Sequence, residues 1–169
     1  LLLKKPKRIL EVGAAVAYSS LVMAETLEGN VKISTIENYE KRVLEARKNI
    51  ADSNYSNTIH LIEEDASKVL KELVEKKEKY DFIFMDAAKG QYINWLEPVI
   101  KLLNKEGVLC SDNVLQGGDI VQSRYLIERR DRSIHSRLRE YLYELTHREE
   151  LSTTILSLGD GVALTVLKK

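Results

Sequence analysis

The chain has 169 residues, and its 26 Lys and Arg side chains balance 26 Asp and Glu, so the formal net charge is zero. A neutral chain has no global field that draws in nucleic acid, and any basic binding surface must therefore be local. Hydrophobic residues make up 44% and charged residues 31%, which is the ordinary composition of one soluble domain of this length. The apolar runs are only as long as strands, which excludes a membrane-spanning helix.

Short runs rich in Val, Ile and Leu alternate along the chain with longer stretches of helical period. Strands are expected at residues 8–12, 31–36, 59–63, 80–85 and 107–111. Helices are expected at residues 18–27, 39–51, 66–77 and 91–103. We expect Pro98 to kink or restart the last of these helices. This succession implies a parallel sheet covered by helices on both faces.

The carboxyl-terminal part has a different pattern. A helix is expected over residues 133–146, followed by two strand-like runs at 153–158 and 162–167 that Gly159-Asp160-Gly161 joins. A turn that short makes a hairpin, so the last strand is expected to run antiparallel to its predecessor. A sheet closed in this way differs from a dinucleotide-binding sheet built of two equivalent halves.

The single cysteine, Cys110, lies in an apolar run and has no second cysteine to pair with. We expect a reduced core residue of a cytoplasmic protein. The alternative is a reactive thiol.

Acidic and amide side chains follow two neighbouring predicted strands. Asp86 comes directly after the fourth strand, and Asp112 and Asn113 follow the fifth. In open α/β sheets ligands bind at the carboxyl ends of strands, so we expect these side chains to meet there. Three oxygen ligands suit Mg²⁺ or Ca²⁺ and leave coordination positions for a substrate oxygen. The sequence predicts a divalent-metal site with Lys89 as a nearby base; the alternative is that these residues cap solvated loops.

Small residues, among them Gly13, Ala14 and Ala15, join the first strand to the first helix. They let the backbone approach a ligand, and a helix start offers free N–H groups to an anionic group. Tight packing of the helix on the sheet is the alternative. Glu37, just past the second strand, favours a ligand, because a carboxylate there can accept hydrogen bonds from ribose hydroxyls. Asp65, taken alone, predicts a helix cap.

Six segments, taken in chain order, carry a resemblance over nearly the whole chain. They are Glu11-Val12-Gly13 with Tyr18-Ser19, Glu37, Asp65-Ala66, Asp86 to Tyr92, Ser111 to Leu115 and Gly159-Asp160-Gly161. Together they resemble the cation-dependent O-methyltransferases, and the pairing of Asp-x-x-Lys with a later Asp-Asn is the most specific part. That family includes catechol and caffeoyl-coenzyme A enzymes and bacterial relatives that methylate 5-hydroxyuridine at the tRNA wobble position. The resemblance implies a Rossmann-like class I methyltransferase: a three-layer α/β/α fold with a seven-stranded, mostly parallel sheet and an antiparallel carboxyl-terminal hairpin strand.

The resemblance also implies S-adenosylmethionine as methyl donor. The implied cofactor-binding residues are Glu11, Gly13, Ala14, Tyr18, Ser19, Glu37, Asp65, Ala66 and Asp86. Gly13 and Ser19 would hold the methionine part, Glu37 the ribose, and Asp65 and Ala66 would border the adenine. Asp86, Asp112 and Asn113 are the implied ligands of Mg²⁺ or another divalent cation. Lys89, the base, and Asp86 are the implied catalytic residues, and a homodimer is expected.

The chain departs from the family pattern in two places. Ala17 stands where the family usually has a second glycine, and a position that demands a positive φ would disfavour its Cβ. The leading residues Leu1 to Leu3 fit the tail of a helix that begins upstream, with Pro6 as the break. We therefore expect a single methyltransferase domain over residues 1–169 without the amino-terminal helical region of its relatives.

A local basic segment gives the clue to the acceptor. Its arginines are Arg124, Arg129, Arg130, Arg132, Arg137 and Arg139. They could hold the phosphates of a tRNA anticodon stem-loop while a splayed base enters the pocket. The alternative is a solvated helix face with internal ion pairs. The predicted function is thus Mg²⁺-dependent methylation of tRNA 5-hydroxyuridine. The alternatives are a catechol- or caffeoyl-coenzyme A-type small-molecule O-methyltransferase and, third, a degenerate cofactor-binding scaffold.

Overall fold

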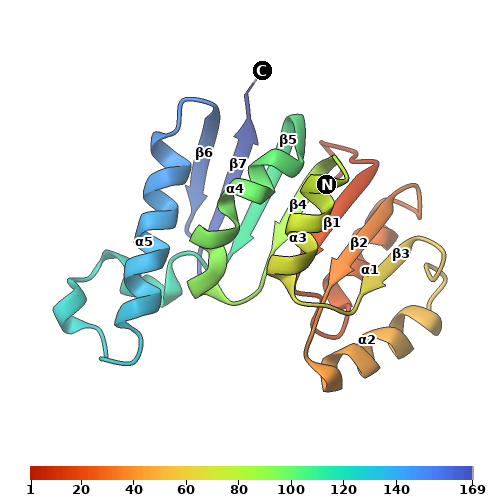
Figure 1. The fold of residues 1–169 in the computed structure, drawn as a ribbon, viewed down its shortest axis with the longest axis horizontal. Coiled ribbons are helices and arrows are strands. Elements are labelled where there is room, and N and C mark those ends of the chain that lie inside the picture. The colour runs from red at the N-terminus through yellow and green to blue at the C-terminus, as the bar shows by residue number, and fades with distance from the viewer. Residues whose placement is uncertain (169) are drawn as a thin grey trace.

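Residues 1–168, which the computed structural model describes with the exception of the Arg124 side chain, contain a seven-stranded sheet. Its strand order is β3-β2-β1-β4-β5-β7-β6 (Figure 1). Neighbouring strands are parallel except where β7 is involved, since β7 runs antiparallel to both β5 and β6. The predicted sheet, mostly parallel with an antiparallel carboxyl-terminal strand, is confirmed.

The elements follow the predicted succession. The strands are β1 (Arg8–Val12), β2 (Lys32–Ile36), β3 (Ile59–Ile62), β4 (Tyr80–Met85), β5 (Leu103–Asp112), β6 (Leu151–Leu156) and β7 (Val162–Leu167). The α-helices are α1 (Tyr18–Thr26), α2 (Glu40–Ala51), α3 (Ala66–Glu75), α4 (Tyr92–Leu102) and α5 (Arg132–His147). Three short 3₁₀ helices, which the sequence did not predict, are η1 (Lys89–Gln91), η2 (Gln116–Val121) and η3 (Arg124–Leu126).

Most predicted bounds are within two residues of the observed ones, and β5, β6 and the proline of α4 are the informative differences. β5 begins directly after α4 because Leu103 already pairs with Tyr80 of β4, ahead of a shift in register. β6 lies two residues earlier than predicted because its register with β7 places Leu156 opposite Val162, which leaves residues 157–161 as the turn. α4 continues through Pro98 to Leu102, so this proline does not restart the helix.

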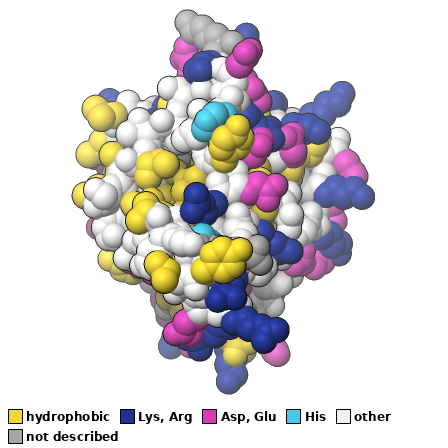
Figure 2. Space-filling model, turned by 90° about the vertical axis from the view of Figure 1, so that its left-hand side faces the viewer, with side chains coloured by type: hydrophobic (Ala, Val, Ile, Leu, Met, Phe, Trp, Pro, Cys, Tyr) yellow, Lys and Arg dark blue, Asp and Glu magenta, His cyan; other side chains and the backbone are white. Residues whose placement is uncertain are grey.

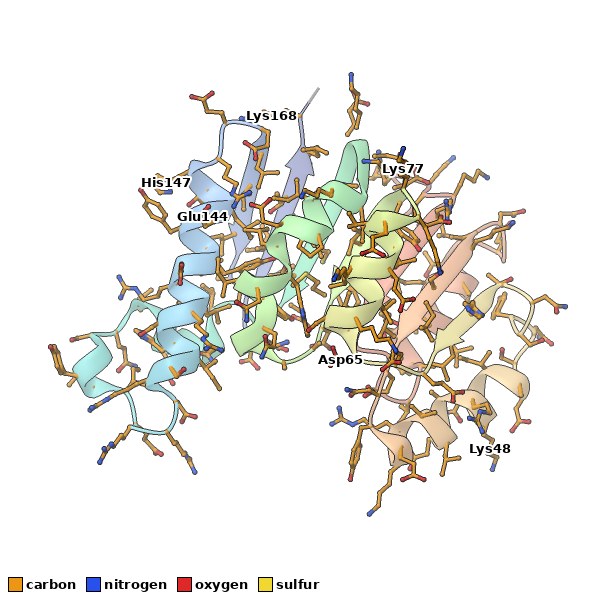
Figure 3. All side chains as sticks on the ribbon, in the orientation of Figure 1. Lys48, Asp65, Lys77, Glu144, His147 and Lys168 are labelled. Carbon is orange, nitrogen blue, oxygen red and sulfur yellow. The ribbon has the colours of Figure 1, made fainter. Side chains whose placement is uncertain are left out.

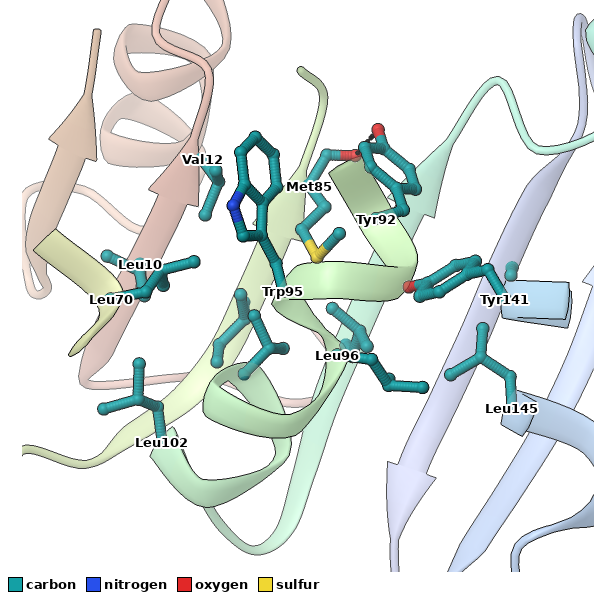
Figure 4. Packing of buried hydrophobic residues seen from close by; sticks show 14 of the residues in the cluster. Leu10, Val12, Leu70, Met85, Tyr92, Trp95, Leu96, Leu102, Tyr141 and Leu145 are labelled. Atoms are coloured by element: carbon teal, nitrogen blue, oxygen red, sulfur yellow. Dashed lines mark hydrogen bonds between the residues drawn. The ribbon is translucent and has the colours of Figure 1, made fainter. Parts of the chain in front are cut away.

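Successive strand residues face two separate apolar cores. Leu10 and Ile83 lie in the core that α3, α4 and α5 cover, whereas Ile9 and Ile33 lie in the core that α1 and α2 cover. Figure 1 shows α3, α4 and α5 in front of the sheet. Figure 4 shows the packing of α4 against the strands and α5. Helices on both faces give the three-layer α/β/α architecture, as predicted.

Cys110 lies partly buried in β5 as a free cysteine. Burial raises the pKa of its thiol to about 11, so the thiolate that reactivity requires is scarce near neutral pH. In the part of the chain that the structure describes, the helices are too short or too polar to cross a bilayer.

Candidate active site

A cavity of about 510 Å³ opens at the carboxyl ends of β1, β2 and β4. The carboxyl-terminal edge of the sheet, where the sequence predicted ligand binding, therefore contains a cavity. Five of the predicted cofactor-binding residues line it, namely Gly13, Glu37, Asp65, Ala66 and Asp86. The remaining lining residues are Val12, Ala15, Ile36, Asn38, Tyr39, Arg42, Glu64, Ser67, Ala87, Ala88, Gln91 and Trp95.

The turn after β1 is folded tightly against the end of β4. Gly13 has a φ of +103°, and a Cβ on it would lie 2.1 Å from the carbonyl oxygen of Asp86, so only glycine fits here. The N–H groups of Gly13 and Ala14 both donate to the carbonyl of Ile36, at 3.1 and 2.9 Å. The neighbouring strand β2 thus already satisfies these two N–H groups, which are not free for a ligand.

Ala17 caps the start of α1 with a φ of +66° and a fully buried side chain. This is the left-handed region, which costs an L-residue roughly 1–2 kcal/mol. The position that usually carries glycine in the family thus does demand a positive φ. The buried Ala17 methyl packs in the core beneath α1, which offsets part of that cost.

Glu37 is a rigid acceptor at the edge of the cavity, with only 8% of its surface exposed. Its Oε2 accepts from the N–H of Ala15 at 3.0 Å, and its Oε1 accepts from the N–H groups of Asn38 and Tyr39, each at 3.0 Å. Three backbone donors thus fix both carboxylate oxygens. A carboxylate oxygen has more than one acceptor site, so Glu37 can still accept hydrogen bonds from a ligand in the cavity.

Asp65 caps α3, as its sequence context predicted, and it also lines the cavity (Figure 3). Its Oδ1 accepts from the N–H groups of Ser67 at 2.9 Å and Lys68 at 3.3 Å. Across the cavity wall, Nε1 of Trp95 donates to the Ser67 hydroxyl at 3.0 Å. The indole is thereby fixed as an apolar wall, a role that its position in the sequence did not reveal.

Glu11 lies in the core instead of in the cavity, with no exposed surface. Its carboxylate accepts hydrogen bonds from the hydroxyls of Ser19, Ser20 and Thr35. Burial raises the pKa of Glu11, and these three hydroxyls oppose that shift. The structure therefore places Glu11 as a support that ties α1 to β1 and β2.

Three more predicted cofactor residues do not line the cavity. Ala14 is buried, Tyr18 is 74% exposed on the first turn of α1, and the Ser19 hydroxyl is engaged by Glu11. None of these three residues is among those that line the cavity. A cofactor in this cavity would meet the backbone of the turn and the Ala15 side chain instead.

A second group of polar side chains lies beside the cavity, where β4 and β5 end. We call it the acceptor edge, and it consists of Asp86, Lys89, Tyr92, Asp112 and Asn113. Lys89 Nζ donates to Asp86 Oδ1 at 2.8 Å and to the Tyr92 hydroxyl at 3.0 Å. The Tyr92 hydroxyl donates to the carbonyl of Met85 at 2.8 Å and lies 3.3 Å from the carbonyl of Asp112. The structure thus brings the two acidic segments and Lys89 together around one tyrosine.

The segment after β5 is held by the hairpin turn. Val114 and Leu115 donate their N–H groups to the carbonyls of Gly161 and Asp160, at 2.9 and 2.8 Å. A Cβ on Gly161 would lie 2.3 Å from the Leu115 side chain, so this glycine permits the close approach. The Gly159-Asp160-Gly161 motif therefore supports the loop that presents Asp112 and Asn113.

The side-chain oxygens at this edge are suitable ligands for a hard divalent cation. Asp112 Oδ1 accepts from the Asn113 N–H at 2.7 Å, and Asp86 Oδ1 pairs with Lys89. The other oxygen of each carboxylate and the Asn113 side-chain oxygen have no hydrogen-bond partner among the described residues. Two carboxylates and an amide form an oxygen set of the kind that Mg²⁺ accepts. In that same part of the chain, no group of three or more His, Cys, Asp and Glu residues is arranged to hold a metal.

A family model described as O-methyltransferase matches residues 1–169. The chain belongs to the O-methyltransferase family. The predicted enzyme class, an S-adenosylmethionine-dependent O-methyltransferase, is thereby confirmed.

Individual relatives agree with this family. A flavonoid 3',5'-methyltransferase from Vitis vinifera is 32% identical over 165 residues, which cover 94% of this chain and 69% of the relative. A caffeoyl-CoA O-methyltransferase from Citrus natsudaidai is 31% identical over 172 residues, with coverages of 94% and 70%. The structure of an O-methyltransferase from Bacillus cereus in complex with SAH has a TM-score of 0.87 at 26% identity, and covers 98% of this chain and 76% of that one.

The arginines of the predicted basic segment have different environments in this O-methyltransferase. Arg139 donates to the carbonyl of Gln122 at 3.4 Å. Arg129, Arg132 and Arg137 line a hollow of about 480 Å³ at the start of α5. Arg130 instead forms ion pairs with Glu128 and Asp131, at 3.0 and 3.4 Å, as the solvated-face alternative expects. Figure 2, which views the molecule from the side on which α5 lies in Figure 1, shows Lys and Arg side chains gathered at its lower end. The side chain of Arg124 lies outside the described part of the chain.

Proposed function

We propose that this enzyme transfers a methyl group from S-adenosylmethionine to a hydroxyl of a small catechol-type acceptor, with a divalent cation at Asp86, Asp112 and Asn113. The observation that carries the proposal is the acceptor edge itself. Two carboxylates and an amide with unused oxygens lie beside Lys89, next to a cavity of about 510 Å³. A catechol offers two adjacent oxygens, which match the free positions of a cation held by three protein ligands.

The cavity supplies the groups for the methyl donor. Glu37 would accept hydrogen bonds from ribose hydroxyls. Asp65, Ala66 and Trp95 form the opposite wall and would border the adenine. Gly13 lets the chain pass close to the methionine part. Asp86 reaches both the cavity and the acceptor edge, so the methyl donor and the acceptor would lie on its two sides.

When bound, S-adenosylmethionine supplies an electrophilic methyl group, and a divalent cation makes an acceptor hydroxyl easier to deprotonate. Lys89 Nζ, which lies at this edge, would take the proton of the acceptor hydroxyl. Asp86 and the Tyr92 hydroxyl orient this amine, since both accept hydrogen bonds from it. The adjoining cavity would hold the methyl donor next to this amine, and such positioning contributes much of the rate in reactions of this kind.

The names of the relatives favour a small acceptor over tRNA. They include a flavonoid methyltransferase, a caffeoyl-CoA O-methyltransferase and a catechol O-methyltransferase from Niastella koreensis. The small-molecule alternative from the sequence thus becomes the main proposal. Methylation of tRNA 5-hydroxyuridine stays the second candidate, because the hollow at Arg129, Arg132 and Arg137 could hold RNA phosphates.

Methyl transfer from labelled S-adenosylmethionine tests the proposal. Parallel assays would contain a catechol or tRNA that carries 5-hydroxyuridine, each with Mg²⁺ or with a chelator. We expect labelling of the catechol that the chelator abolishes. Labelling of tRNA alone would favour the second candidate, and catechol labelling that survives the chelator would contradict the cation.

A further inference from the structure

Tyr92 occupies the centre of the acceptor edge although it lines neither the cavity nor the hollow of arginines. It is the first residue of α4, directly after η1, and its side chain has no exposed surface. Its ring meets that of Tyr141 edge to face, with the centroids 5.4 Å apart. Figure 4 shows the Tyr92 hydroxyl directed at the end of β4 beside Met85. The ring is therefore fixed by packing, and its hydroxyl occupies one position.

The Tyr92 hydroxyl uses all of its hydrogen-bonding capacity. It donates to the carbonyl of Met85 at 2.8 Å and lies 3.3 Å from the carbonyl of Asp112. It accepts from Lys89 Nζ at 3.0 Å and from the Ala87 N–H at 3.3 Å. A phenol has one proton and two lone pairs, so one atom joins the end of β4, the end of β5 and the proposed base.

These contacts matter because they fix the position of the Lys89 amine. Its side chain has four rotatable bonds, and only 17% of it is exposed. Asp86 and Tyr92 are the two side chains that hold its amine. In the proposed function Asp86 also serves the cation, whereas the Tyr92 hydroxyl accepts from Lys89 without contacting the cation.

We infer that Tyr92 is a positioning residue for the methyl transfer. Its hydroxyl fixes Lys89 Nζ and keeps the end of β4 in place relative to Asp112, so that the base and the proposed cation ligands keep a constant separation. This inference rests on the proposed function. Displacement of a reacting group by about 1 Å can reduce a rate about 100-fold, and loss of one orienting hydrogen bond should produce part of that effect.

The structure offers a matched control. Tyr141 is also fully buried, and its ring packs against the ring of Tyr92. Its hydroxyl forms a hydrogen bond with Ser111 Oγ at 2.6 Å. Tyr92→Phe and Tyr141→Phe each remove one hydrogen-bonded hydroxyl from the same core. Only Tyr92→Phe removes a contact to Lys89, so the two substitutions separate positioning from packing.

The test is the steady-state kinetics of both variants with the catechol and Mg²⁺. We expect Tyr92→Phe to lower kcat about 10- to 50-fold while KM for the catechol and the affinity for S-adenosylhomocysteine change less than twofold. Tyr141→Phe should leave kcat within twofold, although both variants lose similar stability. Equal losses of kcat in the two variants would overturn the inference.

A double substitution tests whether Tyr92 acts through Lys89. In a Lys89→Met background, Tyr92→Phe should lower the residual kcat less than twofold, because the positioned group is already absent. An undiminished loss in that background would contradict positioning.

If Tyr92→Phe does not fold, 3-fluorotyrosine at position 92 makes the hydroxyl a weaker acceptor, and an unchanged kcat would overturn the inference. The parent enzyme in the same assay tests the proposed function separately.

Discussion

The cofactor cavity and the acceptor edge lie side by side on one sheet, but their polar groups are satisfied differently. In the cavity, Glu37 accepts from three backbone N–H groups and Asp65 from two. At the acceptor edge, each proposed carboxylate ligand keeps an oxygen without a partner in the described chain, and the Asp86 side chain is 45% exposed. Both carboxylate oxygens of Glu37 are thus held by the backbone before any ligand binds, whereas Asp86 and Asp112 each keep one oxygen for an added ligand.

This difference suits the two reactants. A preorganised cavity loses little freedom when a constant cofactor binds. Unused oxygens at the acceptor edge suit the proposed cation, which would in turn bind the oxygens of the methyl acceptor. Substitutions in the cavity should therefore change affinity for the cofactor, and substitutions at the acceptor edge should change turnover.

The largest expected effect is at the acceptor edge. Asp112→Ala removes a charged ligand of the proposed cation, and we expect kcat/KM for the catechol to fall about 1,000-fold, since such an ion supplies several kcal/mol. Affinity for S-adenosylhomocysteine, measured by calorimetry, should change less than twofold. Asp119→Ala, an exposed aspartate in η2, is the control. A tenfold or smaller loss in Asp112→Ala would contradict the assigned ligand.

A smaller effect is expected in the cavity. Glu37→Ala removes the acceptor proposed for the ribose and releases the N–H groups of Ala15, Asn38 and Tyr39. We expect affinity for S-adenosylhomocysteine to fall about 10- to 100-fold, because hydrogen bonds to charged groups contribute about 1.5–3 kcal/mol. At saturating cofactor, kcat should stay within threefold. If kcat falls while affinity is retained, the contrast between the two regions fails.

The smallest effect concerns the support beneath the cavity. Burial raises the pKa of Glu11, so the folded state binds this proton more tightly than the unfolded chain. Protonation of Glu11 therefore adds to the free energy of unfolding. This contribution is complete below the pKa of about 4.3 that Glu11 has in the unfolded chain, and it is lost as the pH rises through the pKa in the folded state. Urea denaturation should therefore show that the parent loses stability relative to Glu11→Gln from pH 4 to pH 7.

Glu64→Gln is the control for that measurement. Glu64 is exposed, and its hydrogen bond with Lys68 lowers its pKa, so its contribution has the opposite sign and is lost as the pH falls. If the difference between the parent and Glu11→Gln does not change with pH, Glu11 is not the buried acid that the structure indicates.

Local sequence features predicted the positions that depend on local structure. β1 and β4 begin and end at the predicted residues, and Asp86 and Asp112 emerge at neighbouring strand ends because each follows a buried run. Asp65 caps α3, as its position before a helical stretch indicated.

Tertiary contacts determined the rest. Glu11 directly precedes Val12 and Gly13, but its side chain points into the core because α1 and β2 place three hydroxyls there. The Tyr92 hydroxyl reaches the carbonyl of Asp112, twenty positions away, only because β4 and β5 are neighbours. Arg130 pairs with Glu128 and Asp131, whereas Arg129, Arg132 and Arg137 line the hollow. Which arginine does which depends on how the turn before α5 folds.

Binding of Mn²⁺ tests the proposed cation site most directly. Electron paramagnetic resonance of free Mn²⁺ would be followed as the parent enzyme and Asp112→Ala are added, each with S-adenosylhomocysteine and a catechol present. The account predicts one Mn²⁺ bound per parent chain and at least a 100-fold weaker affinity in Asp112→Ala, with S-adenosylhomocysteine bound equally by both. Equal Mn²⁺ binding by the two proteins, or none by the parent, would contradict it.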